Sequence, residues 1–181
     1  MNSPLHLDTS RLQLRWLELS DAEFIYRLVN DPQWLHFIGD KRVSNLDNAR
    51  SYIEEGPQAM YREQGFGLNR VALRDDHTPI GICGLLQRES MVDCDLGFAL
   101  LPGYRGQGYA FEAASAILQH GFGKLDKKRI AAIVSADNQA SVGLLIRLGF
   151  QREGKINIEP DRDPVDLYVM HRETRVMLPG A

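Results

Sequence analysis

The stretch best suited to chemistry is Leu101-Pro102-Gly103-Tyr104-Arg105-Gly106-Gln107-Gly108-Tyr109-Ala110. An apolar run ends here, a loop with three glycines follows, and an amphipathic segment begins at once. Glycines at 106 and 108 let the main chain approach a ligand closely, and the first turn of a following helix adds unpaired N–H donors. The turn therefore suits a phosphate. The alternative is a tight connection without a ligand, which is the better interpretation of a lone glycine-rich turn.

A second motif lies downstream, where Asn138-Gln139-Ala140-Ser141 begins a predicted helix and Leu148-Gly149-Phe150 ends it. The first motif fits Arg/Gln-x-x-Gly-x-Gly/Ala, and the second fits Asn-x-x-Ala/Ser followed by Leu-Gly-Phe. Together, at this separation, they resemble the GNAT superfamily of acetyl-CoA-dependent N-acetyltransferases. The resemblance covers essentially the whole order of predicted elements.

Three further segments are most similar to one branch of that superfamily, the ribosomal-protein N-terminal acetyltransferases (RimJ/RimL). They are the Arg11-Leu12 strand, the helix stop at Asn30-Asp31-Pro32 and the strand Asp95-Leu96-Gly97-Phe98. A dinucleotide-binding protein of the Rossmann type fits poorly, because the turn lacks the G-x-G-x-x-G order and no acidic ribose ligand follows at the expected distance.

The resemblance implies a set of residues for acetyl-CoA. The main chain from Arg105 through Phe111 would hold the pyrophosphate, with Arg105 adding a charge, and one strand would hydrogen-bond the pantetheine arm and direct an N–H at the thioester carbonyl. Asn138 would bind the cofactor or its neighbouring loop, although a role as N-cap alone would also satisfy it. No metal is expected. The residues implied are Phe98, Ala99, Leu100, Arg105, Gly106, Gln107, Gly108, Tyr109, Ala110, Phe111 and Asn138.

Transfer of acetyl to an amine requires a group that deprotonates the amine, a donor to the oxyanion and an acid for the leaving thiolate. Many members of the family place a tyrosine acid seven residues after the motif asparagine, but this chain has Leu145 there. Tyr168 or another residue would have to reach the site. We favour Ser141 as the substitute that contacts the sulfur, with completion of the helix cap as its alternative role.

Two carboxylates are candidates for the base. Asp95 shares one face of a predicted strand with Asp93, and Glu159 lies in the connection between the last two strands, where the branch walls its acceptor site. The alternative for Glu159 is an ordinary solvated position, and one water can relay the proton in either case. Trp34 and His36, in the predicted connection 33–42, are expected to bind the acceptor or else to close the edge of the core.

Composition limits the classes of function. The chain has 181 residues, and 21 basic against 24 acidic side chains give a net charge of −3, which offers no electrostatic case for nucleic acid. Cys83 and Cys94 are too few for a disulfide framework or a zinc site. The segment Met1 to Asp8 lacks a targeting pattern, and no apolar run approaches the roughly 20 residues of a membrane helix. We expect a soluble, cytoplasmic monomer or homodimer.

The remaining pattern predicts one α+β domain over residues 1–181. A mostly antiparallel mixed sheet of six to seven strands would be flanked by about four helices, and the resemblance implies a splayed parallel pair at its centre. A capping box at Ser20 and Glu23 and a bend at Gly56-Pro57 are expected in the first two helices. Predicted strands are 11–17, 66–74, 80–87, 92–101, 129–134, 150–156 and 164–177; predicted helices are 20–29, 44–62, 109–122 and 138–148.

The leading hypothesis is acetyl transfer from acetyl-CoA to a primary amine, most of all the α-amino group of a protein N-terminus. A small cationic amine, such as a polyamine or an antibiotic, is the alternative acceptor. A catalytically silent acyl-CoA-binding module is the alternative from another class, supported by the missing tyrosine at Leu145.

Overall fold

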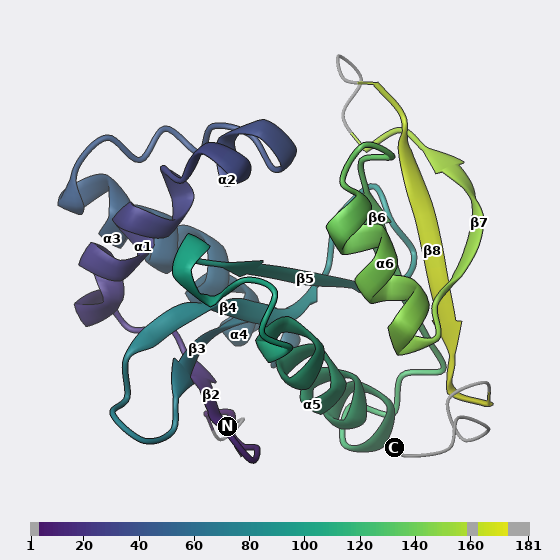
Figure 1. Ribbon diagram of the computed structural model, residues 1–181, viewed down its shortest axis with the longest axis horizontal. Coiled ribbons are helices and arrows are strands. Elements are labelled where there is room, and N and C mark those ends of the chain that lie inside the picture. The colour runs from purple at the N-terminus through teal and green to yellow at the C-terminus, as the bar shows by residue number, and fades with distance from the viewer. Residues whose placement is uncertain (1–3, 159–162, 174–181) are drawn as a thin grey trace.

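The computed structural model describes residues 4–158 and 163–173. Within them, eight strands form one sheet in the order β1-β2-β3-β4-β5-β6-β8-β7 (Figure 1). All neighbouring strands are antiparallel except β5 and β6, so the predicted mixed sheet is confirmed. The strands are β1 (His6–Asp8), β2 (Leu12–Trp16), β3 (Leu68–Leu73), β4 (Pro79–Leu86), β5 (Asp95–Leu100), β6 (Arg129–Val134), β7 (Gln151–Ile156) and β8 (Val165–His171).

The parallel pair at the centre of the sheet touches at one point. β5 and β6 share a single register pair, Asp95 with Ala131, and beyond it the two strands diverge (Figure 1). On its other side β5 pairs continuously with β4, from Asp95 to Leu100. The splay expected from the resemblance is therefore present, and it leaves one edge of β5 without a strand partner.

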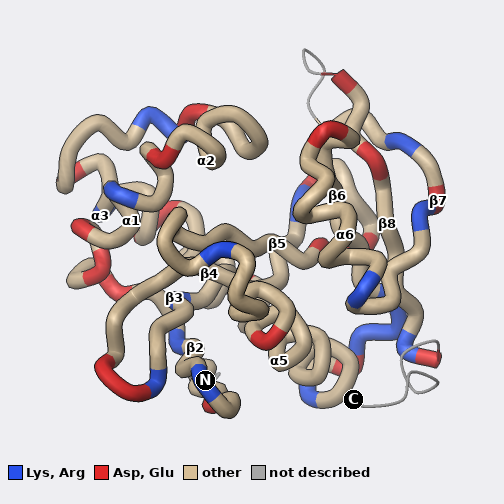
Figure 2. Tube along the Cα trace, in the orientation of Figure 1, with Lys and Arg blue, Asp and Glu red and all other residues tan. Residues whose placement is uncertain are grey.

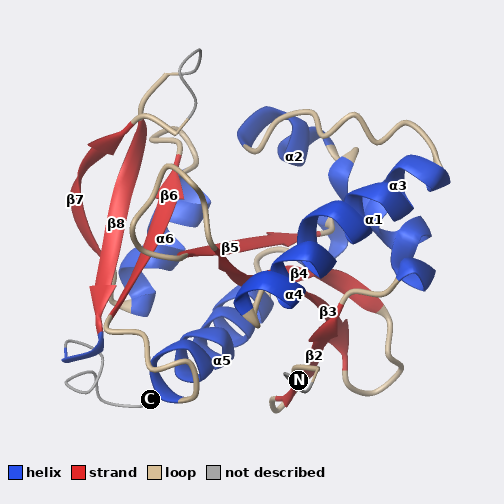
Figure 3. Cartoon of the chain, turned by 180° about the vertical axis from the view of Figure 1, so that it is seen from behind, coloured by secondary structure: helices blue, strands red, loops and turns tan. Residues whose placement is uncertain are grey.

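Helices cover both faces of the sheet. Figures 1 and 3, which show the front and the back, place α5 on one face of β2 to β5 and α1, α3 and α4 on the other. α6 lies against the half that contains β6, β7 and β8. The helices are α1 (Ala22–Val29), α2 (Pro32–Phe37), α3 (Leu46–Ile53), α4 (Ala59–Gln64), α5 (Tyr109–Gly123) and α6 (Gln139–Leu148).

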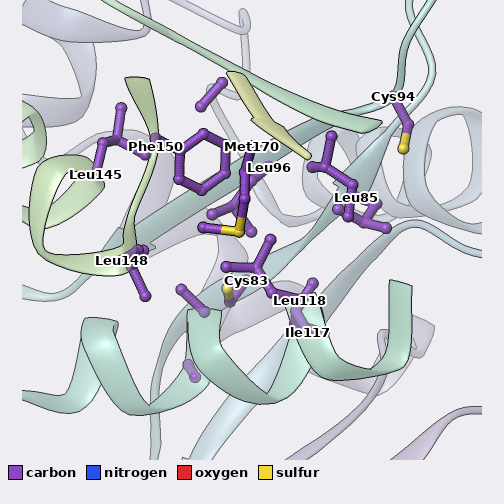
Figure 4. Close-up of a cluster of buried hydrophobic side chains, with 14 of the residues drawn as sticks. Cys83, Leu85, Cys94, Leu96, Ile117, Leu118, Leu145, Leu148, Phe150 and Met170 are labelled. Carbon is purple, nitrogen blue, oxygen red and sulfur yellow. The ribbon is translucent and has the colours of Figure 1, made fainter. Parts of the chain in front are cut away.

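A buried hydrophobic cluster fixes α5 and α6 relative to the sheet (Figure 4). Ile117 and Leu118 of α5 meet Leu145 and Leu148 of α6 in this cluster. Strand side chains complete it, including Cys83, Leu85, Leu96, Phe150 and Met170. Because both helices share one core, the positions of their N-termini are determined together.

The prediction of a connection at 33–42 is partly wrong, because its first half belongs to a separate short helix, α2. Asp31, expected as part of a helix stop, is the N-cap of α2 and accepts the N–H groups of Gln33 and Trp34, at 3.1 and 3.4 Å. Pro32 occupies the first helical position, where its missing N–H costs nothing. The same residues that end α1 therefore begin α2.

The capping box predicted at Ser20 and Glu23 is also wrong, by two residues. A 3-10 turn, Leu19–Asp21, precedes α1, and the Asp21 carboxylate accepts the N–H of Glu18 at 2.9 Å. The guanidinium of Arg15 holds both oxygens of that carboxylate at 2.8 Å. Glu18 and Asp21 thus take the two positions of the capping box that the pattern assigned to Ser20 and Glu23.

The remaining differences are smaller. The three-residue β1 was not predicted, because it is too short to show alternation. A π turn at Glu54–Gln58, with Pro57 inside it, interrupts the second predicted helix where a bend was expected. β5 begins at Asp95, so Asp93 lies before the strand and pairs with Arg129 at 3.0 Å instead of sharing its face. The predicted last strand ends at His171 within the described residues.

Candidate active site

A cavity of about 860 Å³ opens where β5 and β6 diverge. The turn after β5, the start of α5 and the start of α6 line one part of it, and α2, α3 and the π turn line another. The cleft therefore joins the two sequence motifs to the aromatic residues of the N-terminal helices.

The glycine-rich turn supplies free backbone donors to this cleft. Gly106 and Gly108 have φ values of +74° and +82°, in the left-handed region that favours glycine. Gly108 is the N-cap of α5, and no side chain caps that helix. Among the described residues, no hydrogen bond occupies the backbone N–H groups of residues 106–111. Six successive unpaired donors at a helix N-terminus are suited to bind an anion.

The side chains of the turn contribute less than its backbone. The guanidinium of Arg105 donates from Nε to the carbonyl of Leu100 at 2.9 Å and from Nη2 to the Asp31 carboxylate. Its charge is thus paired within the protein and ties the end of β5 to α2. Gln107 is exposed and does not line the cleft, whereas Tyr109, Ala110 and Phe111 do. The Arg147 guanidinium lies 5.0 Å from the centre of the Phe111 ring.

The unpartnered edge of β5 offers a second set of backbone groups. Phe98, Ala99 and Leu100 all line the cleft while they pair with β4. Ala131 donates to the carbonyl of Cys94 at 2.9 Å on the β6 side. Because alternate residues of a strand point their backbone groups to the same neighbour, Phe98 presents its N–H and C=O toward the gap left by β6.

The start of α6 places two polar side chains in the cleft. Asn138 Oδ1 accepts the N–H of Ser141 at 3.1 Å, so the predicted N-cap is confirmed. Both residues line the cleft, and the Ser141 hydroxyl has no hydrogen-bond partner among the described residues. Ser141 is thus available to a ligand without loss of the cap.

Asp95 lies at the point where the two central strands part, and it is only 1% exposed. Arg88 holds both of its oxygens, from Nε at 2.9 Å and from Nη2 at 3.2 Å. Burial raises the pKa of the Asp95 carboxyl, and the Arg88 charge and hydrogen bonds oppose that rise. Arg88 occupies one acceptor site on each oxygen, so each oxygen keeps a second lone pair that can accept a proton.

Of the two residues predicted to bind the acceptor, only Trp34 lies at the cleft. Trp34 of α2 lines the cleft and is 4% exposed, and its indole Nε1 has no hydrogen-bond partner among the described residues. His36 does not line the cleft, and its Nε2 lies 3.3 Å from the carboxylate of Asp137, at the loop before α6. The prediction for Glu159 lies outside the described residues.

The missing tyrosine is not replaced from β8. Leu145 is buried in the core, and Tyr168 is buried there too and does not line the cleft. Tyr52 of α3 does line it, and burial raises the pKa of its hydroxyl to about 12. The sequence contains no signal for the place of Tyr52 at the cleft, because that place depends on packing against a distant strand.

Within the stretches that the structure describes, no group of three or more His, Cys, Asp or Glu side chains is arranged to hold a metal ion. No helix in the described part of the chain is long and apolar enough to cross a membrane.

Known proteins share this arrangement. The sequence model of the acetyltransferase (GNAT) domain matches residues 11–151. The uncharacterized N-acetyltransferase YoaA of Bacillus subtilis is 31% identical over 151 residues, which cover 82% of this chain and 84% of YoaA.

Solved structures agree with the sequence comparison. The crystal structure of an acetyltransferase from Agrobacterium tumefaciens superposes with a TM-score of 0.79 at 26% identity and covers 94% of this chain and 96% of its own. The apo structure of RimL, a ribosomal L7/L12 α-N-protein acetyltransferase, superposes with a TM-score of 0.78 at 18% identity, covering 93% and 94%, and shows a shared fold. On the sequence match and the geometry of the cleft, this chain belongs to the GNAT family of N-acetyltransferases.

Proposed function

We propose that the protein transfers acetyl from acetyl-CoA to the α-amino group of a protein N-terminus, as the RimJ/RimL branch does. The observation that carries the proposal is the run of six unpaired N–H donors at residues 106–111, beside the open edge of β5. The donors of the turn would hold the pyrophosphate, and Phe98, Ala99 and Leu100 would hold the pantetheine arm along the strand edge. Asn138 borders the same channel.

Three groups would carry the reaction. The amine loses a proton and its nitrogen bonds to the acetyl carbon, and the carbon–sulfur bond then breaks with its electron pair on sulfur. The Phe98 N–H would stabilise the charge on the carbonyl oxygen, and the Ser141 hydroxyl would contact the departing thiolate. Asp95 or Glu159 would receive the amine proton, through a water in the case of Asp95 because that side chain is almost fully buried.

The charge of the cleft favours an acceptor with one amine over a polycation. Among the described lining residues, four are cationic and two are acidic; Arg88 is paired with Asp95 and Arg105 with Asp31, which leaves a small excess of positive charge. In the rest of the described chain, acidic and basic positions both occur in each half of the molecule (Figure 2). A polyamine would meet like charges here, which repel it. The lining charges are Lys41, Arg88, Arg105, Arg147, Asp95 and Asp163.

The neighbourhood of Trp34 is consistent with a peptide acceptor. Trp34 and Phe37 of α2, with Tyr52 and Met60 opposite, give this part of the cleft an apolar and aromatic wall. Such a wall can bury the first side chain of a peptide. Trp34 would therefore bind the acceptor. His36 would contribute only indirectly, from outside the cleft, by its contact with Asp137 in the loop before α6.

Two measurements test the proposal. Isothermal titration of the natural chain with CoA should give saturable binding, and no binding would overturn the cofactor assignment. Thiol release from acetyl-CoA should then be compared between short peptides with free and with blocked N-termini, and a linear polyamine at matched concentration. Turnover with free N-termini alone supports the proposal, turnover with the polyamine alone supports the alternative acceptor, and binding without any turnover supports a silent acyl-CoA-binding module.

A further inference from the structure

The turn before β2 meets the first turn of α5 at a single carboxylate, that of Glu112. Glu112 Oε1 accepts the hydroxyls of Thr9 and Ser10 at 2.6 and 2.9 Å and the backbone N–H of Arg11 at 2.8 Å. Its Oε2 accepts Arg11 Nε at 2.7 Å. The Glu112 side chain is 16% exposed, so solvent competes weakly for these bonds.

These hydrogen bonds keep the Glu112 carboxylate charged. Burial raises the pKa of the carboxyl, but the four hydrogen bonds outweigh it and lower the pKa to about 2. A negative charge in the first turn of α5 would repel a phosphate bound at the start of the same helix. The guanidinium of Arg11 lies directly against that charge and neutralises it.

Arg11 also reaches the phosphate turn itself. Its Nη1 donates to the carbonyl of Gln107 at 3.0 Å, and its guanidinium lies 4.4 Å from the centre of the Tyr109 ring. A Cβ atom added to Gly108 would stand 3.3 Å from Arg11 Nη2. Arg11 does not line the cleft, whereas Gly108 does, so the contact is made from behind the turn.

The geometry of the peptide bond gives this contact a consequence for binding. In a trans peptide the C=O of one residue and the N–H of the next point in opposite directions. The Arg11 side chain draws the Gln107 carbonyl away from the cleft, and the N–H of Gly108 is thereby turned into it. The same bond prevents this carbonyl from facing an anion.

We propose that Arg11 and Glu112 are positioning residues that aim the amides of the phosphate turn without touching the cofactor. The inference rests on the proposed binding of CoA by residues 106–111. It gives a role to the Arg11-Leu12 strand, which the sequence motif singled out and the reaction itself does not use.

The chain offers a matched control. Arg74 donates from Nη1 to the carbonyl of Thr9 at 3.1 Å, so it supports the same turn before β2, and it has no contact with the phosphate turn among the described residues. Arg74→Ala should loosen that support while leaving the Gln107 carbonyl in place. Arg11→Lys keeps a charge near Glu112 but cannot hold Glu112 and Gln107 together with one planar group.

The test compares CoA with pantetheine, which lacks the pyrophosphate, in direct titrations that need no acceptor. Arg11→Ala should weaken CoA binding about tenfold or more and change pantetheine binding less than about twofold, because only the pyrophosphate meets the turn. The CoA affinity of Arg11→Lys should lie between those of the natural chain and Arg11→Ala. Arg74→Ala should bind both CoA and pantetheine like the natural chain. Adding Glu112→Gln to Arg11→Ala should recover part of the loss, because it removes the uncompensated charge.

The outcomes are distinct. Equal weakening of CoA and pantetheine in Arg11→Ala would mean a merely structural role, and unchanged CoA binding would also overturn the inference while the proposed function stands. A natural chain that binds pantetheine but gains nothing from the pyrophosphate would overturn both. Thermal melting of each variant, measured alongside, shows whether a loss of binding follows a loss of fold.

Discussion

Two helices begin at the edge of the same cleft, and they begin in opposite ways. α6 starts with Asn138, whose side chain takes up the N–H of Ser141. α5, which is longer, starts with Gly108 in a left-handed conformation and has no side-chain cap. Relative to alanine, a side-chain cap stabilises a helix by about 1 kcal/mol, whereas glycine at the N-cap gives up only a few tenths of a kcal/mol, so leaving α5 without a side-chain cap has a small cost.

The difference between the two helix starts shows that the groups that stabilise a helix need not be the groups that bind the ligand. At α6 the protein itself uses the backbone N–H groups of Gln139 and Ser141, and the ligand is offered side chains such as that of Ser141. At α5 the donors stay free, and stabilisation is supplied from behind by Glu112 and its partners before β2. A binding helix start can therefore be left uncapped when another element holds the helix in place.

The largest effect is expected from filling the uncapped start. Gly108→Trp introduces a bulky side chain at φ +82°, close to Arg11, and should weaken CoA binding by about 100-fold or more. Isothermal titration measures it. Gly103→Ala, in the same turn, is the control, because a Cβ there meets nothing within 4 Å and should leave binding unchanged. Equal affinity in both variants would contradict the role given to the turn.

The next effect concerns α6. Ser141→Ala removes the hydroxyl but keeps the backbone N–H that Asn138 caps, so the melting temperature should stay within a degree or two. If the hydroxyl assists the departing thiolate, kcat should fall at least about tenfold while KM for acetyl-CoA hardly changes. Steady-state thiol release distinguishes the two parameters. A rise in KM alone would instead assign Ser141 to cofactor binding.

The support behind α5 should depend on pH. Because the pKa of Glu112 is about 2 in the folded protein against an ordinary 4.5, its contribution is full above pH 4.5 and is lost as the pH falls toward 2. Glu112→Gln should therefore lower stability by about 2 kcal/mol at pH 7 and by progressively less below pH 4.5. Urea unfolding of the natural chain and of Glu112→Gln, at pH 7 and at pH 3, measures the loss of stability at each pH. A difference that is independent of pH would mean that the charge of Glu112 is unimportant.

The smallest effect is expected from removing the cap of α6. Asn138→Ala should cost about 1 kcal/mol, because one donor of the first turn is left without its acceptor, and Asn138→Asp should restore most of it. Thermal or urea unfolding gives the values. CoA binding should change less than about fivefold, and a greater loss would show that Asn138 also contacts the ligand.

Much of the fold was predictable from local pattern. The nearly all-apolar run of β6 and the capped helix α6 were predicted with their boundaries, because their signals lie within one element. α2 was missed because six residues are too few for helical periodicity, and because Asp31-Pro32 can end one helix and begin another. The shift of the first capping box came from Arg15, a residue on a different element.

The candidate site also has a part that local sequence predicts and a part that it does not. Its backbone part could be predicted, because glycine at a left-handed position and a helix start are written in consecutive residues. Its side-chain part could not, because the pairs that fix it are far apart in the chain. Arg105 meets Asp31 across 74 residues, and Arg11 meets Glu112 across 101. A single sequence carries no signal for such partners.

The parting of β5 from β6 has a thermal consequence. The half of the molecule formed by β6, β7, β8 and α6 is joined to the rest by one strand register pair, by the hydrophobic cluster around Leu96, Phe150 and Met170, and by surface ion pairs such as Asp93–Arg129. Hydrophobic association weakens on cooling, whereas hydrogen-bonded ladders on either side do not share this dependence. Cold should therefore loosen this seam before it loosens either half, so that the working range of the protein is bounded from below by the seam and from above by the melting of the sheet.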